Sequence, residues 1–185
     1  MATEALKSTP ITNLDASPVT ANTEGEGASG RLRAITDTVT ATAGVTTGST
    51  YRLCRIPTTA KVKRVLLSCA AEGATGAADI NVAHSDSTTD GTPASLQGTI
   101  PQIAAADNKL FGAAVVLTSA LKNSDTTFAN TFTPAHQNLP LWQVLVNLGV
   151  TTFAADPGGF FDILLKTTAT MANGGFVAVE VDYVE

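Results

Sequence analysis

The sequence predicts a mainly β protein, an antiparallel β-sandwich of jelly-roll type with one short helix and an extended N-terminal arm. Three observations predict this fold. Short apolar or alternating segments recur between clusters of Gly, Asp, Ser and Pro, at spacings typical of sandwiches and barrels. Threonine is over-used, with 29 residues, and its branched Cβ fits a pleated strand. The last strand-like segment alternates clearly with a period of two. A different Greek-key arrangement is the alternative.

The first 30 residues predict the extended arm, and residues 31–185 predict the sandwich domain. Polar residues, glycine and proline isolate the apolar residues of the arm, which are Leu6, Ile11, Leu14 and Val19. Such a segment buries too little apolar surface to offset the entropy of ordering its backbone. We therefore expect it to be disordered alone and ordered only against a partner. No continuous apolar run follows its charged start, so it is not expected to be a secretory signal peptide.

The expected strands follow one another along the domain, over residues 31–42, 51–56, 61–69, 77–84, 160–168 and 176–184. Residues 111–117 fit either a strand or part of a short helix. In the segment 51–56, strict alternation places Arg52 and Arg55 on opposite faces. The Gly-rich turn at 173–175 predicts that the last two strands form a hairpin.

The segment LPLWQVLVNL, residues 139–148, is the one good helix signal. Pro140 lies near its start and Gly149 follows its end, which is the usual placement of these residues around a helix. Three of its leucines share one face, so the helix is expected to pack on the core. Trp142 in the first turn is expected to be a core anchor.

Charge is unevenly distributed along the chain, whose net charge is −5. Residues 31–64 contain seven basic residues and one acid, which gives +6, whereas residues 1–30 carry −3 and residues 65–185 carry −8. The negative total predicts no bulk attraction to nucleic acid or to an anionic membrane. The basic segment fits solvated strand faces, or a basic strip that meets an acidic partner or the acidic parts of the same protein.

The sequence contains little that predicts catalysis. The two histidines, His84 and His136, are far apart and lack metal-ligand spacing, and no nucleophile or phosphate-binding motif occurs. The loop around Asp86 and Asp90 offers oxygen ligands, but its spacing matches no calcium loop and favours a solvated turn. We therefore expect no enzyme activity, no catalytic residues, no metal site and no cofactor.

The two cysteines, Cys54 and Cys69, lie in neighbouring expected strands. A disulfide is geometrically conceivable, but two buried free thiols that pack as small hydrophobic groups are the favoured interpretation. No run of 18 apolar residues occurs, so no membrane span is expected.

Six segments of the chain carry a resemblance to known proteins. They are KSTPITNLDASPVTAN, RIPTTAKVKRVLLSC, AADINVAHSDSTTDGTP, FGAAVVLTSAL, LPLWQVLVNLG and GGFFDILLKTTATMANGGFVAVEVDYV. Together they resemble the capsid cement or decoration proteins of tailed bacteriophages. The likeness covers most of the chain and consists of soft motifs without a catalytic signature. The chain differs from the family pattern in the loop after Ile80, where NVAHSDSTTDG replaces a shorter turn that contains tyrosine.

This resemblance implies a structural virion protein, made in the host cytoplasm, that binds the outer surface of an icosahedral head and stabilises contacts between capsomers. The implied partners are the major capsid protein and further copies of the chain, as a dimer or a trimer, with neither nucleic acid nor membrane. The arm residues named above become candidate capsid contacts, and Arg31, Arg33, Arg52 and Arg55 become candidate polar anchors. A head-fibre or tail component for host attachment, and a β-sandwich module that binds glycans or proteins, are the alternatives.

Overall fold

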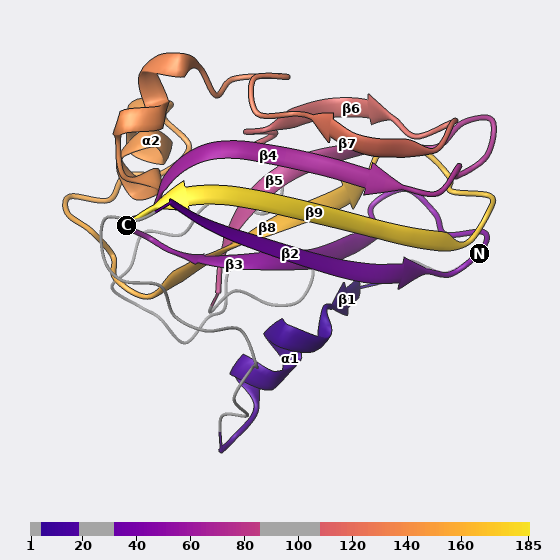
Figure 1. Cartoon of the computed structure of the whole chain (residues 1–185), viewed down its shortest axis with the longest axis horizontal. Coiled ribbons are helices and arrows are strands. Elements are labelled where there is room, and N and C mark those ends of the chain that lie inside the picture. The colour runs from indigo at the N-terminus through magenta and orange to yellow at the C-terminus, as the bar shows by residue number, and fades with distance from the viewer. Residues whose placement is uncertain (1–4, 19–31, 86–107) are drawn as a thin grey trace.

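Two β-sheets pack face to face around one hydrophobic core in the computed structural model, which describes residues 5–18, 32–85 and 108–185 (Figure 1). One sheet has five strands in the order β1-β3-β8-β5-β6, and the other has four in the order β2-β9-β4-β7. The pair β1–β3 is parallel, and the other pairs are antiparallel. The structure therefore confirms a mainly β protein with two sheets.

The strands agree with most of the segments expected from alternation. Their bounds are β1 (Ala5–Lys7), β2 (Leu32–Ala41), β3 (Thr50–Pro57), β4 (Lys61–Cys69), β5 (Ala77–His84), β6 (Gly112–Val116), β7 (Leu121–Asp125), β8 (Phe160–Thr167) and β9 (Gly175–Val184). The ambiguous segment around residues 111–117 contains the strand β6. The polar strand β7 was not predicted, because it is built by backbone pairing with β4 and not by apolar alternation.

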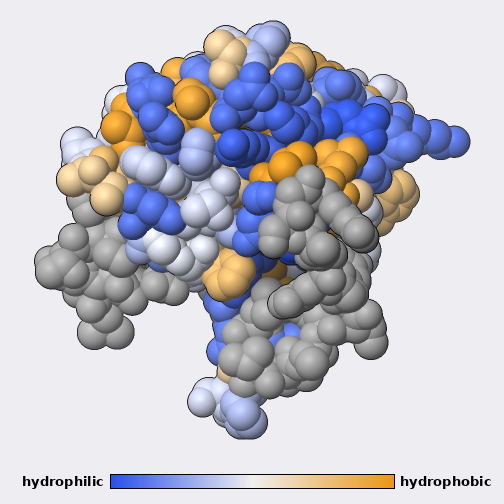
Figure 2. Space-filling model, turned by 60° about the vertical axis from the view of Figure 1, so that its left-hand side comes forward, coloured by the Kyte–Doolittle hydropathy of each residue, from blue (hydrophilic) through white to orange (hydrophobic). Residues whose placement is uncertain are grey.

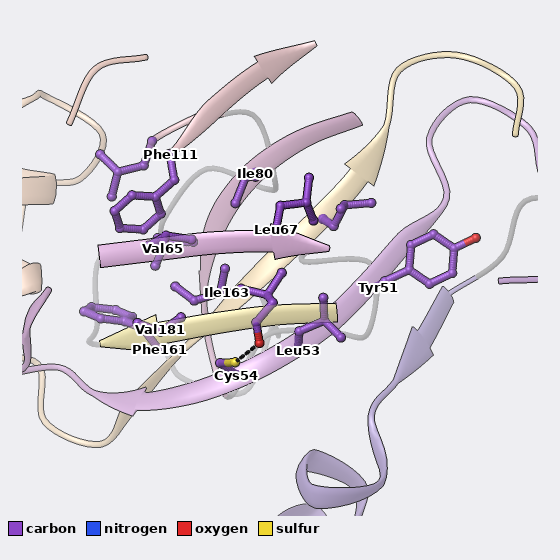
Figure 3. Close-up of a cluster of buried hydrophobic side chains, with 14 of the residues drawn as sticks. Tyr51, Leu53, Cys54, Val65, Leu67, Ile80, Phe111, Phe161, Ile163 and Val181 are labelled. Atoms are coloured by element: carbon purple, nitrogen blue, oxygen red, sulfur yellow. Dashed lines mark hydrogen bonds between the residues drawn. The ribbon is translucent and has the colours of Figure 1, made fainter. Parts of the chain in front are cut away.

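The core contains inward-facing side chains from both sheets (Figure 3). Leu53 and Ile163 come from the five-stranded sheet, and Val65 and Val181 from the four-stranded sheet, and all four are fully buried. Burial of one such side chain contributes about 1.5–3 kcal/mol. The alternation expected in the last strand is confirmed in β9, where Val177, Val179, Val181 and Tyr183 are all buried.

The predicted hairpin between the last two strands is wrong. β8 pairs with β3 and β5, whereas β9 pairs with β2 and β4, so the two strands belong to different sheets. Residues 168–174 cross from one sheet to the other instead of closing a turn. In this connection the Met171 N–H donates to the Val45 carbonyl, and the Gly44 N–H donates to the Met171 carbonyl, each at 3.0 Å. Each strand thus has a neighbour on both sides.

The predicted helix is confirmed as α2 (Leu141–Asn147), which lies at one end of the two sheets (Figure 1). Leu141, Val144 and Leu145 are buried against the core, and Trp142 is half-buried against it. Gly149, with a φ of +69°, follows the helix in the left-handed region where glycine is favoured. The structure adds two helical segments that were not predicted, α1 (Thr9–Asp15) and the 3-10 helix η1 (Pro134–Asn138).

Both cysteines are buried free thiols in the structure, as the favoured interpretation predicted. Cys54 lies on β3 and Cys69 on β4, in different sheets. The Cys54 thiol donates to the Val179 carbonyl at 3.1 Å (Figure 3). In the described ranges, the helices are too short or too polar to cross a membrane.

Candidate assembly interface

The N-terminal segment is attached to the edge of the five-stranded sheet. β1 pairs with the start of β3, with Leu6 opposite Tyr51 and Lys7 opposite Arg52. The pairing continues for one more residue, because the Ser8 N–H donates to the Arg52 carbonyl at 3.0 Å. Such edge pairing supplies affinity through main-chain hydrogen bonds.

Ser8 also starts the helix that follows. Its hydroxyl accepts from the Ile11 N–H at 3.4 Å, and its carbonyl accepts from the Thr12 hydroxyl at 2.9 Å. Proline in the first turn of α1 needs no N–H partner there. Ile11 is fully buried, and α1 contacts β3. The segment therefore has a cap, a preset first turn and one buried apolar contact.

The expectation that the whole arm is disordered alone is wrong for residues 5–15. They form β1 and α1 on the sheet edge of their own chain (Figure 1). The physical reason is that β3 offers a free edge and that charged groups on its outer face hold α1. Compositional reasoning about the arm did not include these groups. Residues 19–31, which include the candidate contacts Val19 and Arg31, lie outside the described residues.

A chain of ion pairs joins α1 to the sheet. We call Lys7, Asp15, Arg55, Asp162 and Arg52 the anchor cluster. The Arg55 guanidinium donates from Nε to Asp162 Oδ1 at 2.6 Å and from Nη2 to Oδ2 at 2.9 Å. Its Nη1 donates to Asp15 Oδ1 at 2.7 Å, and Asp15 Oδ2 accepts from Lys7 Nζ at 2.6 Å. Arg55 thus bridges the domain and the N-terminal segment.

Arg52 lies at the buried end of the anchor cluster. Its side chain has no exposed surface, and its Nη1 donates to Asp162 Oδ2 at 2.9 Å. The same guanidinium also donates to the carbonyls of His84 and Ser85, at 3.2 and 3.3 Å. A buried arginine needs such paired acceptors, because an uncompensated buried charge is strongly unfavourable.

The predicted placement of Arg52 and Arg55 on opposite faces is wrong. The pairing of β3 with β8 shifts register between these two residues, which marks a bulge or similar irregularity. An extra residue in one strand reverses the alternation beyond it, so both arginines reach the same carboxylate. The irregularity therefore creates a two-arginine site around Asp162.

Electrostatics favour the charged forms of Arg55 and Asp15 in the anchor cluster. Burial opposes the charge on Arg55, but hydrogen bonds and attraction from Asp162 and Asp15 raise its pKa. Burial also opposes the charge on Asp15 and acts to raise its pKa. The hydrogen bonds from Arg55 and Lys7 outweigh this effect and bring the pKa of Asp15 below its ordinary value. The contact of α1 with the sheet is thus present at neutral pH, and it weakens in acid as Asp15 takes up a proton.

The structure places the predicted site residues in three environments. Leu6 is half-buried on β1, Ile11 is buried on α1, and Leu14 is part of α1. Arg52 and Arg55 both bind Asp162 of their own chain. The Arg52 side chain has no exposed surface and cannot reach a separate partner, contrary to the role expected for it. Arg33 on β2 pairs with Glu185 at 3.0 Å.

The basic segment is largely neutralised by acids of the same protein. Besides the anchor cluster and Arg33, Arg64 on β4 pairs with Asp182 at 2.8 Å and lies 3.7 Å from Glu180. This arrangement matches one of the alternatives left open, in which the basic residues meet the acidic parts of the chain. The sequence did not single out Asp162 or Asp15. The signal for Asp162 was a lone acid inside the apolar strand FFDILL.

No protein-family model matches the chain, and no curated protein matches it. Among solved structures, a chain of the cyanophage Pam1 capsid asymmetric unit is similar, with a TM-score of 0.46 and 17% identity. The alignment covers 92% of this chain and 97% of that chain. Similarity at this level does not assign a family.

Replacing Asp15 with asparagine is expected to loosen the N-terminal segment and leave the sandwich folded. Each partly exposed ion pair contributes about 0.2–1 kcal/mol, so two lost pairs increase opening by roughly two- to thirtyfold. Amide hydrogen exchange of residues 5–18 measures this change. Glu180→Gln, which alters net charge equally on the four-stranded sheet, is the control. Equal exchange in both variants would show that Asp15 does not hold the segment.

Proposed function

We propose that the protein is a structural virion protein that binds the outer surface of a phage capsid and stabilises contacts between capsomers. The observation that carries the proposal is the N-terminal segment, a short strand and helix that edge pairing and ion pairs attach to the edge of the five-stranded sheet. Edge pairing, apolar contact and ion pairs are also the means by which a small domain attaches to a neighbouring subunit. The segments that resemble cement proteins support the same proposal.

Stabilisation follows from binding to the assembled state alone. A protein that binds the lattice and not its separated subunits shifts the equilibrium toward the lattice. The shift is about 2.7 kcal/mol per site when the free concentration of the protein is one hundred times its Kd. Many copies on one lattice add avidity. The proposed partners are the major capsid protein and further copies of the chain, and the proposal includes no enzymatic reaction.

The exposed large apolar residues of the described ranges come from several separate elements. Figure 2 shows one face on which hydrophobic residues form separated patches among hydrophilic ones. The exposed large apolar residues are Leu32, Val116, Phe128, Phe160 and Phe176, from β2, β6, β8, β9 and the connection after β7. Scattered positions of this kind suit several small contacts with a lattice better than one large apolar interface.

The jelly-roll arrangement is part of the proposal. The strand orders β2-β9-β4-β7 and β3-β8-β5-β6 support it, because strands that follow one another in the chain mostly lie in alternate sheets. An eight-stranded jelly roll built from two Greek keys has two such four-stranded sheets. In this arrangement β1 is an additional strand on the outer edge of β3.

The test is binding to empty, expanded phage heads. The full chain is expected to sediment with the heads in a fixed ratio to the major capsid protein and to raise their melting temperature. A variant without residues 1–18 is expected to bind more weakly, and the folded sandwich of that variant is checked by circular dichroism. Failure of the full chain to sediment with heads at micromolar concentration would contradict the proposal.

A further inference from the structure

Glu72 is a buried carboxylate in the connection between β4 and β5. Glu72 has no exposed surface, and neither Oε1 nor Oε2 of its side chain has a hydrogen-bond partner among the described residues. Buried polar side chains are normally hydrogen-bonded, and a buried ionised carboxylate without a partner is costly. Glu72 is therefore an exception that calls for a physical explanation.

The backbone of Glu72 joins three connections at one end of the sandwich. Its N–H donates to the carbonyl of Leu117, which follows β6, at 2.9 Å. Its carbonyl accepts from the N–H of Ala172, between β8 and β9, at 3.0 Å. The Asn173 side chain adds a bond to the Ala71 carbonyl at 3.2 Å. A backbone rearrangement that carries Glu72 toward water would therefore disturb all three connections.

The packing around Glu72 is tight. A Cβ at Gly76 would lie 2.8 Å from the Glu72 Cβ, and a Cβ at Gly175 would lie 3.4 Å from Oε1. The former distance is shorter than real Cβ contacts allow, so glycine at position 76 is needed for the connection to close over the side chain. The carboxyl group is held in place by this packing.

The neighbouring elements offer no cation to this carboxylate. The connections that surround it, residues 73–76, 117–120 and 168–174, contain no Asp, Glu, Lys, Arg or His. The titratable group that faces it from β4 is the thiol of Cys69. Burial raises the pKa of Cys69, and the charge of Glu72 raises it further. The thiol therefore favours its neutral form, and in neither form does it offer the carboxylate a positive charge.

We propose that the protonation state of Glu72 controls closure of this end of the sandwich: the neutral carboxylic acid stabilises the closed form, and ionisation favours opening of the connections at 70–76, 117–120 and 168–174. Burial raises the pKa of Glu72 to about 7, which places the change in the neutral range. The β8–β9 connection leads into β9, where Phe176 is half-exposed next to Gly175. Opening would therefore change the surface at this end of the four-stranded sheet.

The experiment is amide hydrogen exchange of the full chain between pH 5 and pH 8, corrected for the intrinsic effect of pH. In the wild type, protection of the three connections is expected to fall by about tenfold per pH unit up to about pH 7 and to level off above it. Glu72→Gln keeps the size and the buried position but cannot ionise, so its protection is expected to be constant. Glu180→Gln, which replaces a side chain that is 31% exposed, is expected to follow the wild type.

Two results would overturn the proposal. One is wild-type protection of these connections that does not change between pH 5 and pH 8. The other is an equal loss of protection in Glu72→Gln. If that variant does not fold, a carbon-13 titration of the glutamate carboxyl groups in the wild type decides, because a midpoint near 4.5 for Glu72 would contradict the proposal.

Discussion

Replacing Asp162 with asparagine is expected to lower the free energy of unfolding by about 3–5 kcal/mol. The substitution keeps the shape of the side chain but removes the anion that Arg52 and Arg55 share. Arg52 has no exposed surface, so its charge would stay buried, with the carbonyl groups of His84 and Ser85 among its remaining acceptors. Urea unfolding measures the loss.

Asp182→Asn is the matched control for this prediction. Asp182 also pairs with an arginine, at 2.8 Å, but the Arg64 side chain is 48% exposed and stays hydrated when its partner is lost. The expected loss is about 0–1 kcal/mol. Equal losses in the two variants would mean that the burial of Arg52 does not determine the contribution of Asp162. A loosened N-terminal segment in Asp162→Asn, seen by hydrogen exchange, would link the anchor cluster to that segment.

The stability of the wild type is expected to fall as the pH rises from about 4.5 to about 7, because of Glu72. The sign follows from the two pKa values. The folded pKa of about 7 lies above the ordinary value of 4.5, so the folded state holds the proton more tightly. The stabilisation is complete below pH 4.5 and is lost as the pH rises through 7. A difference of this size corresponds to about 3 kcal/mol.

Glu72→Gln is expected to remove this slope and to be the more stable protein at pH 8. Urea unfolding at pH 5, 6, 7 and 8 measures both effects, with Glu180→Gln as the control that keeps the slope. Asp15 acts in the opposite direction, since its lowered pKa adds stability that is lost in acid, but only near and below pH 4. A wild-type stability that is constant from pH 5 to pH 8 would contradict the prediction.

The positions of the strands could be predicted because apolar alternation indicates which residues are buried, and turn residues indicate where the strands end. The ranges 61–69 and 77–84 agree with β4 and β5 to the residue. In both strands the apolar residues that alternate along the sequence are the residues that fill the core. The helix at 141–147 was found for a similar reason, since its leucines share one face.

The pairing of strands and the anchor cluster depend on contacts between distant residues, which one sequence does not reveal. The Gly-rich turn at 173–175 indicated a hairpin locally, but the ladders with β2 and β4 determine where β9 lies. The irregularity between Arg52 and Arg55 is set by the pairing with β8. The site around Asp162 depends on both that irregularity and the position of α1. The sequence therefore contains the residues of the site but does not indicate that they are in contact.

The position of β9 inside its sheet has a consequence for the order in which the chain can fold. β9 follows the other described strands in the chain, and it pairs over its full length with β2 from Leu32 to Ala41 and, on its other side, with β4. During synthesis, the edges of β2 and β4 that pair with β9 therefore stay unpaired until β9 has left the ribosome. Contacts between residues so far apart in the chain also slow folding. The four-stranded sheet is thus completed only after translation of its final strand, whereas the ladder between β3, β5 and β8 has its residues available earlier.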